Sequence, residues 1–166
     1  MAKISNLSQV LGRLTTAIGE LPSSCTQVLP NVNTLLSDAK NLDFIDASPG
    51  ASGSETVAQV APTLAAYNPS GPLSSIVSGT YAVTLNGPGN SISNVVLLSS
   101  NFWATDSYGN NANYSVGQGT ALVHELLHYV TQYSDPAFVQ NYGISVPQGA
   151  SYSSAISAWL QNGCKN

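Results

Sequence analysis

The sequence predicts an α+β fold in a single domain that covers residues 1–166. Apolar residues recur at helical spacing near both ends of the chain, and two segments in its middle have the composition of β-strands. Helix and strand patterns do not alternate as they do in βαβ proteins. We expect residues 1–70 to be mainly helical, and residues 71–166 to hold the sheet, a central helix and a C-terminal helix.

The N-terminal part shows three helical patterns. The first predicts an amphipathic helix that ends before Pro22, from the spacing of Ile4, Leu7, Leu11, Leu14 and Ile18. Weaker patterns follow at 32–36 and 57–64, and Pro62 is expected to kink or shorten the second of these. Residues 48–54 lie between them and are a loop by composition.

The strand patterns follow a segment rich in proline and glycine at 68–72. Tyr81, Val83 and Leu85 alternate with smaller or polar residues, which predicts a strand, and residues 86–90 predict the turn after it. The apolar run at 95–98 leads into Phe102 and Trp103 and favours a second strand of the same sheet.

Two helices are predicted in the C-terminal part. Between residues 120 and 130 nearly every residue is apolar except His124, Glu125 and His128, so this helix should be buried on most sides. Residues 152–160 form an amphipathic pattern that stops near Gly163.

Composition excludes several classes of function. Hydrophobic residues make up 43% of the chain and charged residues only 7%, and the net charge is −4. Because no basic cluster is present, nucleic acid is not an expected partner. No apolar run is long enough to span a membrane. The first residues do not resemble a secretion signal, so we expect the chain to be a trimmed form of a longer protein or an excised domain.

The two cysteines, Cys25 and Cys164, lie near opposite ends of the chain. A disulfide between them would stabilise the fold by about 4 kcal/mol on the loop-entropy model and would suit an extracellular protein. The alternative is a pair of unrelated buried thiols.

The motif that points to chemistry is His124-Glu125-Leu126-Leu127-His128, an H-E-x-x-H pattern. Residues four apart share one face of a helix, so both imidazoles can bind one zinc ion. Glu125 can then act as the general base that takes a proton from a metal-bound water. The alternative, two buried structural histidines, requires a separate hydrogen-bond partner for each ring.

A third protein ligand is expected, and Asp135 is the only acidic residue after Glu125. A straight helix would carry Asp135 about 10 Å beyond His128, so the helix must end near residues 130–132. Pro136 disfavours helix at Asp135 and favours such an end, although no glycine assists the turn. The alternative role for Asp135 is a cap or a solvated turn residue.

Roughly the last seventy residues resemble the aspzincins, deuterolysin-like metallopeptidases of the zincin type. The resemblance begins at the run 95–103 and continues through Gly119 to His128. It implies a zincin-like small mixed sheet packed on the H-E-x-x-H helix, with flanking helices, and zinc held by His124, His128 and Asp135. It also implies that Tyr142 steadies the oxyanion, although six residues rather than two separate it from Asp135.

These observations predict a zinc-dependent extracellular endopeptidase that acts as a monomer on a polypeptide substrate. The substrate is expected to add as a strand to an exposed edge at 95–98. One alternative is a non-catalytic interaction domain of a larger secreted protein, stabilised by zinc. Another is an adhesion domain in which the H-E-x-x-H pattern is accidental.

Overall fold

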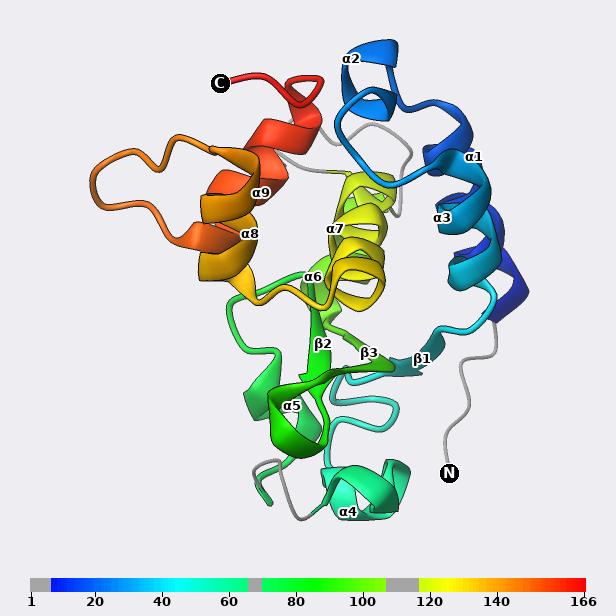
Figure 1. Cartoon of the computed structure of the whole chain (residues 1–166). Helices are drawn as coiled ribbons and strands as arrows, with labels where there is room; N and C mark the ends of the chain where they lie inside the picture. The colour runs from blue at the N-terminus through cyan, green and yellow to red at the C-terminus, as the bar shows by residue number, and fades with distance from the viewer. Residues whose placement is uncertain (1–6, 66–69, 107–116) are drawn as a thin grey trace.

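The computed structural model describes residues 7–65, 70–106 and 117–166. Its architecture is mixed α/β, with a small sheet that carries helices on both faces (Figure 1). The segment before Leu7, including Ile4, and residues 107–116 lie outside the described residues.

The helices largely follow the predicted patterns. Helices α1 and α3 confirm the first two patterns, and the third is split at Pro62 into a short α-helix and a 3-10 turn. The bounds are α1 (Leu7–Gly19), α2 (Ser23–Thr26), α3 (Val32–Ala39), α4 (Val57–Val60), η1 (Pro62–Leu64), α5 (Leu73–Ile76), η2 (Pro88–Asn90), α6 (Ser100–Asp106), α7 (Gln118–Thr131), α8 (Asp135–Tyr142) and α9 (Tyr152–Gln161).

The sheet has three strands, β1 (Asp43–Asp46), β2 (Ala82–Asn86) and β3 (Ile92–Leu98), in the order β1-β3-β2. Strand β1 is parallel to β3 and β2 is antiparallel to it, which confirms the small mixed sheet. Strand β1 was not predicted, because four residues with an aspartate at each end show no apolar alternation.

The structure corrects the expected position of the run at 95–98. This run lies in β3, which is the central strand, so the expectation of an exposed edge there is wrong. Phe102 and Trp103 do not extend a strand either, because they belong to α6. The backbone N–H of Phe102 donates to Oγ of Ser99 at 3.3 Å, an arrangement typical of a helix start.

Both faces of β3 are buried over residues 95–98, which explains the continuous apolar sequence of this run. Val96 and Leu98 belong to the larger core with α1, α3, α7 and α9. Val95 and Leu97 face a second core under α4 and α5. Helix α7 therefore has the sheet on one side and helices on the other (Figure 1), and its residues 121–128 are all buried.

A disulfide joins Cys25 in α2 to Cys164, just after α9, with 5.0 Å between their Cα atoms. The hydroxyl of Ser24 also donates to the carbonyl oxygen of Gly163 at 2.7 Å. The predicted bridge is confirmed, and it ties the end of α9 to the N-terminal helices. None of the helices in the described residues has the length and apolar character needed to cross a membrane.

Candidate metal centre

Helix α7 places the two histidines one turn apart on the same face. Their Nε2 atoms are 3.0 Å apart, and both residues are buried, with exposed fractions of 3% for His124 and 8% for His128. Two imidazoles thus meet edge to edge inside the protein, as the H-E-x-x-H spacing predicts.

Helix α7 ends where the chain must turn back to bring Asp135 to the histidines. It stops at Thr131, and Gln132 adopts a left-handed conformation with φ of 59°. The Gln132 carboxamide compensates for this strained backbone, since its Oε1 accepts from the N–H of Ile92 at 2.9 Å and its Nε2 donates to the Ile92 carbonyl at 3.0 Å. The turn therefore succeeds without glycine because β3 holds it.

Asp135 begins α8 beside the histidines. Its Oδ1 atom lies 2.9 Å from Nε2 of His128 and 3.4 Å from Nε2 of His124. The three residues each offer one ligand atom, and these atoms all lie within 4.8 Å of one another. They form a group that could hold a metal ion, and the chain reversal expected for Asp135 is confirmed.

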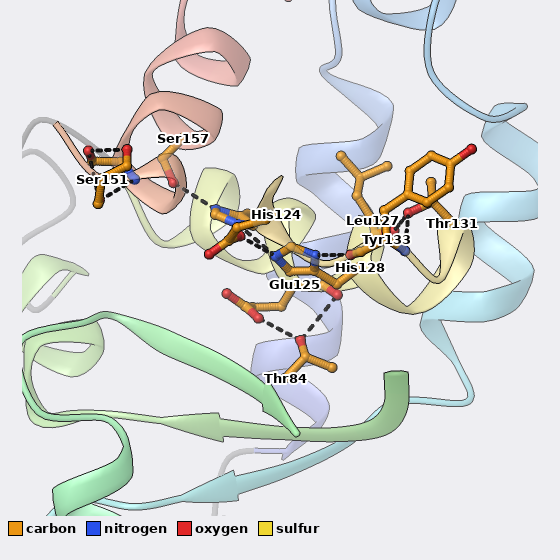
Figure 2. Close-up of polar contacts among 11 residues, drawn as sticks. Thr84, His124, Glu125, Leu127, His128, Thr131, Tyr133, Ser151 and Ser157 are labelled. Carbon is orange, nitrogen blue, oxygen red and sulfur yellow. Dashed lines mark hydrogen bonds and ion pairs between the residues drawn. The ribbon is translucent and has the colours of Figure 1, made fainter. Parts of the chain in front are cut away.

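The far sides of the imidazole rings have partners that orient them (Figure 2). Nδ1 of His128 donates to the carbonyl oxygen of Tyr133 at 2.6 Å, and Nδ1 of His124 lies 2.8 Å from Oγ of Ser157 in α9. A neutral His128 must keep its only proton on Nδ1, because a carbonyl can only accept. Its Nε2 lone pair then faces the second imidazole and a carboxylate, an arrangement that requires a shared proton or cation.

The charges around the cluster favour a cation there. Burial lowers the pKa of His128, but the hydrogen bond with Asp135, the negative charges of Glu125 and Asp135 and the Tyr133 carbonyl raise this pKa from 6.5 to about 9. Burial raises the pKa of Asp135, but the hydrogen bonds and charges of the two histidines lower it well below its usual range. His128 and Asp135 therefore stay ionised at neutral pH, and a bound metal ion would replace the proton on Nε2 of His128.

Glu125 points to the sheet, beside His124 and His128 (Figure 2). The hydroxyl of Thr84 in β2 donates to Oε2 of Glu125 at 2.5 Å. Thr84 belongs to β2, the strand at the edge of the sheet next to α7. This contact orients a buried carboxylate that the metal group does not use as a ligand.

Two adjoining cavities open over this group. One, of about 400 Å³, lies between the segment 79–82 and α9, and the other, of about 340 Å³, follows β2 toward Ile92. His124 and Glu125 line both cavities, while His128 and Asp135 line the second. The candidate ligands and the carboxylate of Glu125 are thus accessible from a cleft that runs along β2.

The structure does not bring Tyr142 to this cleft. Tyr142 lies seven residues after Asp135, at the other end of α8, roughly 10 Å along the helix. Its ring packs on Phe138 and Trp159, with centroid distances of 4.5 and 5.7 Å, and it lines neither cavity. These contacts are those of a packing residue.

Sequence reasoning missed three residues that support the group: Thr84, Gln132 and Ser157. Ser157 carried a usable signal, because it lies among the apolar positions of the C-terminal helix and a buried hydroxyl needs a partner. Thr84 and Gln132 had no such signal, since their contacts cross 41 and 40 residues of sequence.

Comparison of the chain with models of known protein families, with curated proteins and with solved structures finds no match. The resemblance to the aspzincins stays a prediction from the residues themselves. The case for a function therefore depends on the geometry of His124, Glu125, His128 and Asp135.

Proposed function

We propose that the protein is a zinc-dependent peptidase that acts outside the cell, with zinc bound by His124, His128 and Asp135 and with Glu125 as the general base. One observation carries the proposal: two imidazole Nε2 atoms and a carboxylate oxygen converge, while other groups orient the rings from behind. The disulfide supports an oxidising compartment.

The three ligand atoms fit a zinc ion. Zinc bonds of 2.0–2.1 Å in a tetrahedral site put the ligand atoms roughly 3.3 Å apart. The separations here are 2.9, 3.0 and 3.4 Å, so only a slight widening is needed. Two histidines and one carboxylate leave a fourth position for water or substrate, as in catalytic zinc sites.

The position of Glu125 favours hydrolysis over other metal-dependent reactions as the proposed function. Two histidines and a carboxylate also hold iron in oxygenases, but those enzymes do not need a neighbouring base. Zinc would supply a Lewis acid and lower the pKa of a bound water towards 7. Glu125, turned to the cleft and held by Thr84, would take the proton of the attacking water and return it to the leaving amine.

The edge of the sheet supports a polypeptide substrate, at β2 rather than at the strand first expected. The N–H of Ser99 donates to the carbonyl oxygen of Tyr81, so Tyr81 belongs to a hydrogen-bonded pair of the β2–β3 ladder. Since such pairs alternate, the backbone groups of Ala82 and Thr84 point away from β3, towards the cleft. An extended peptide would pair there and pass over Glu125.

The decisive experiment combines metal analysis with proteolysis. Purified protein should contain about one zinc per chain, as expected for a single catalytic site, and should cleave an unfolded protein such as casein. Glu125→Gln should keep the zinc and lose cleavage, while His124→Ala should lose both. Undiminished cleavage by Glu125→Gln, or stoichiometric iron instead of zinc, would reject the proposal.

The alternative, a non-catalytic interaction domain stabilised by zinc, would bind the same ion. Removal of the metal distinguishes the two functions: a structural ion should unfold the domain when it is chelated, whereas a catalytic ion should leave the fold largely intact. The core and the disulfide link the described elements without the cluster, which favours the second outcome.

A further inference from the structure

The larger of the two cavities extends away from the candidate metal ligands. His124 and Glu125 line one part of this pocket, which we call the α9 pocket, and helix α9 forms another part of its wall. At about 400 Å³ it is large enough for one long side chain. The roles proposed for the metal ligands and for Glu125 do not use this space.

The wall of the α9 pocket carries no charge away from the metal group. Apart from His124 and Glu125, its lining residues are serines, alanines, a glycine and other neutral residues. Glu125 turns its Oε2 to Thr84 on the sheet side. A charged guest would therefore find no opposite charge to pair with along the part of the wall that α9 forms.

Two side chains at the far end offer a hydrogen-bond donor and an acceptor. Oε1 of Gln161 accepts from the Thr120 hydroxyl at 2.9 Å, and Nδ2 of Asn162 donates to the Lys165 carbonyl at 3.0 Å. Among the described residues, this leaves the Nε2 donor of Gln161 and the Oδ1 acceptor of Asn162 available to a guest. A carboxamide side chain has the complementary pair of groups.

We propose that the α9 pocket is the specificity pocket of the peptidase and that it selects a neutral, hydrogen-bonding side chain, glutamine or asparagine, next to the scissile bond. This inference rests on the proposed function. Helix α9 then has two roles. Ser157 orients His124, and the next turn of the helix binds the side chain of the substrate.

Ala158 provides a sharp test, because it lines the pocket and its side chain is on the exposed side of α9. Cleavage sites in casein are mapped first, and peptides are made from one of them with Gln, Asn, Leu, Glu or Lys at each position flanking the cut. At one flanking position, the wild type should prefer Gln or Asn to Glu and Lys by about tenfold or more in kcat/KM.

Charge placed in the pocket should change this preference. Ala158→Asp should raise cleavage of the Lys peptide relative to the Gln peptide by about tenfold, and Ala158→Lys should do the same for the Glu peptide. Ala58→Asp is the matched control, an exposed alanine of α4 beneath the other face of the sheet, and should change nothing. Equal cleavage of all five peptides by the wild type, or unchanged preference in both Ala158 variants, would overturn the inference.

A binding readout separates this inference from the peptidase proposal. The zinc-loaded Glu125→Gln variant should bind the fluorescent Gln peptide more tightly than the Lys peptide, and Ala158→Asp in that background should reverse the order. Suppose that the wild type cleaves no peptide, while the preference in binding for the Gln peptide and its reversal in Ala158→Asp are both observed. The peptidase proposal then fails and the pocket's selectivity stands. If cleavage occurs without any such selectivity, the pocket inference alone fails.

Discussion

Nδ1 of His124 lies 2.8 Å from Oγ of Ser157, a residue 33 positions later in a different helix. This contact connects the candidate metal centre to α9, whose far end is held by the disulfide of Cys164. The orientation of one candidate metal ligand thus depends on how α9 docks against α7.

Removal of the Ser157 hydroxyl should weaken metal binding without unfolding the protein. In Ser157→Ala the His124 ring loses the partner that orients it, and loss of such a partner typically costs 10–100-fold in metal affinity. Competition with a chromophoric chelator measures the change. Ser154→Ala, on the exposed side of the same helix, is the control and should bind zinc like the wild type. Equal zinc affinity in Ser157→Ala would show that the contact does not position the ligand.

Loss of the Thr84 hydroxyl should lower the turnover number without changing the amount of bound metal. Thr84→Val keeps the shape of the side chain but removes the hydroxyl that donates to Glu125, so the carboxylate is less well oriented. A net loss of about 1.5–3 kcal/mol for a hydrogen bond to a charged group predicts a fall in kcat of about tenfold or more. Thr84→Ser retains a hydroxyl and should recover most of the activity. A Thr84→Val enzyme with wild-type kcat and normal zinc would remove Thr84 from the proposed mechanism.

Metal affinity should rise with pH, because His128 must lose a proton to bind. With its pKa raised to about 9, the apparent affinity should increase by about tenfold per pH unit between pH 6.5 and 9 and then level off. Chelator competition across this window measures the slope. A flat profile would mean that His128 is not protonated in the metal-free protein.

The metal-free protein should show the opposite trend in stability. Because the folded-state pKa of His128 is raised, the contribution of this residue to the free energy of unfolding is complete below pH 6.5. This contribution is lost as the pH rises through about 9. Because the pKa of Asp135 is lowered, this residue contributes to stability at pH values above 3.8, the ordinary pKa of an aspartate, and the contribution is lost as the pH falls. Thermal unfolding in excess chelator should therefore show a Tm that declines from pH 6.5 to 9. Asp135→Asn should remove most of this decline.

The sequence predicted the elements that local spacing determines. The positions of His124 and His128 follow from helical periodicity, and Asp135 followed from the lack of any other acidic residue after Glu125. Strand β1 had too few residues to show a period, and nothing local indicates that β3 lies between two partners.

The partners of the supporting residues could not be predicted for the same physical reason. The bonds from Ser157 to His124 and from Thr84 to Glu125 join residues 33 and 41 positions apart, and they form only once the helices and sheet have packed. Which strand lies at the edge of the sheet is also a property of the packed fold, so the sequence placed the expected edge at 95–98, in a strand that is central.

Gln132 shows how a missing glycine can be compensated, and it provides the last prediction. Gln132→Ala keeps the left-handed strain but loses the bonds to Ile92, while Gln132→Gly loses the bonds and relieves the strain. Both variants should bind zinc less tightly, because the turn that carries Asp135 is no longer held to β3. Stability should follow the order wild type, Gly, Ala, with about 1 kcal/mol between the two variants from the left-handed backbone alone. Chemical denaturation and chelator competition measure the two effects separately. If Gln132→Gly matched the wild type in zinc affinity, the backbone conformation alone would position Asp135 and the bonds to Ile92 would have no role in the metal centre.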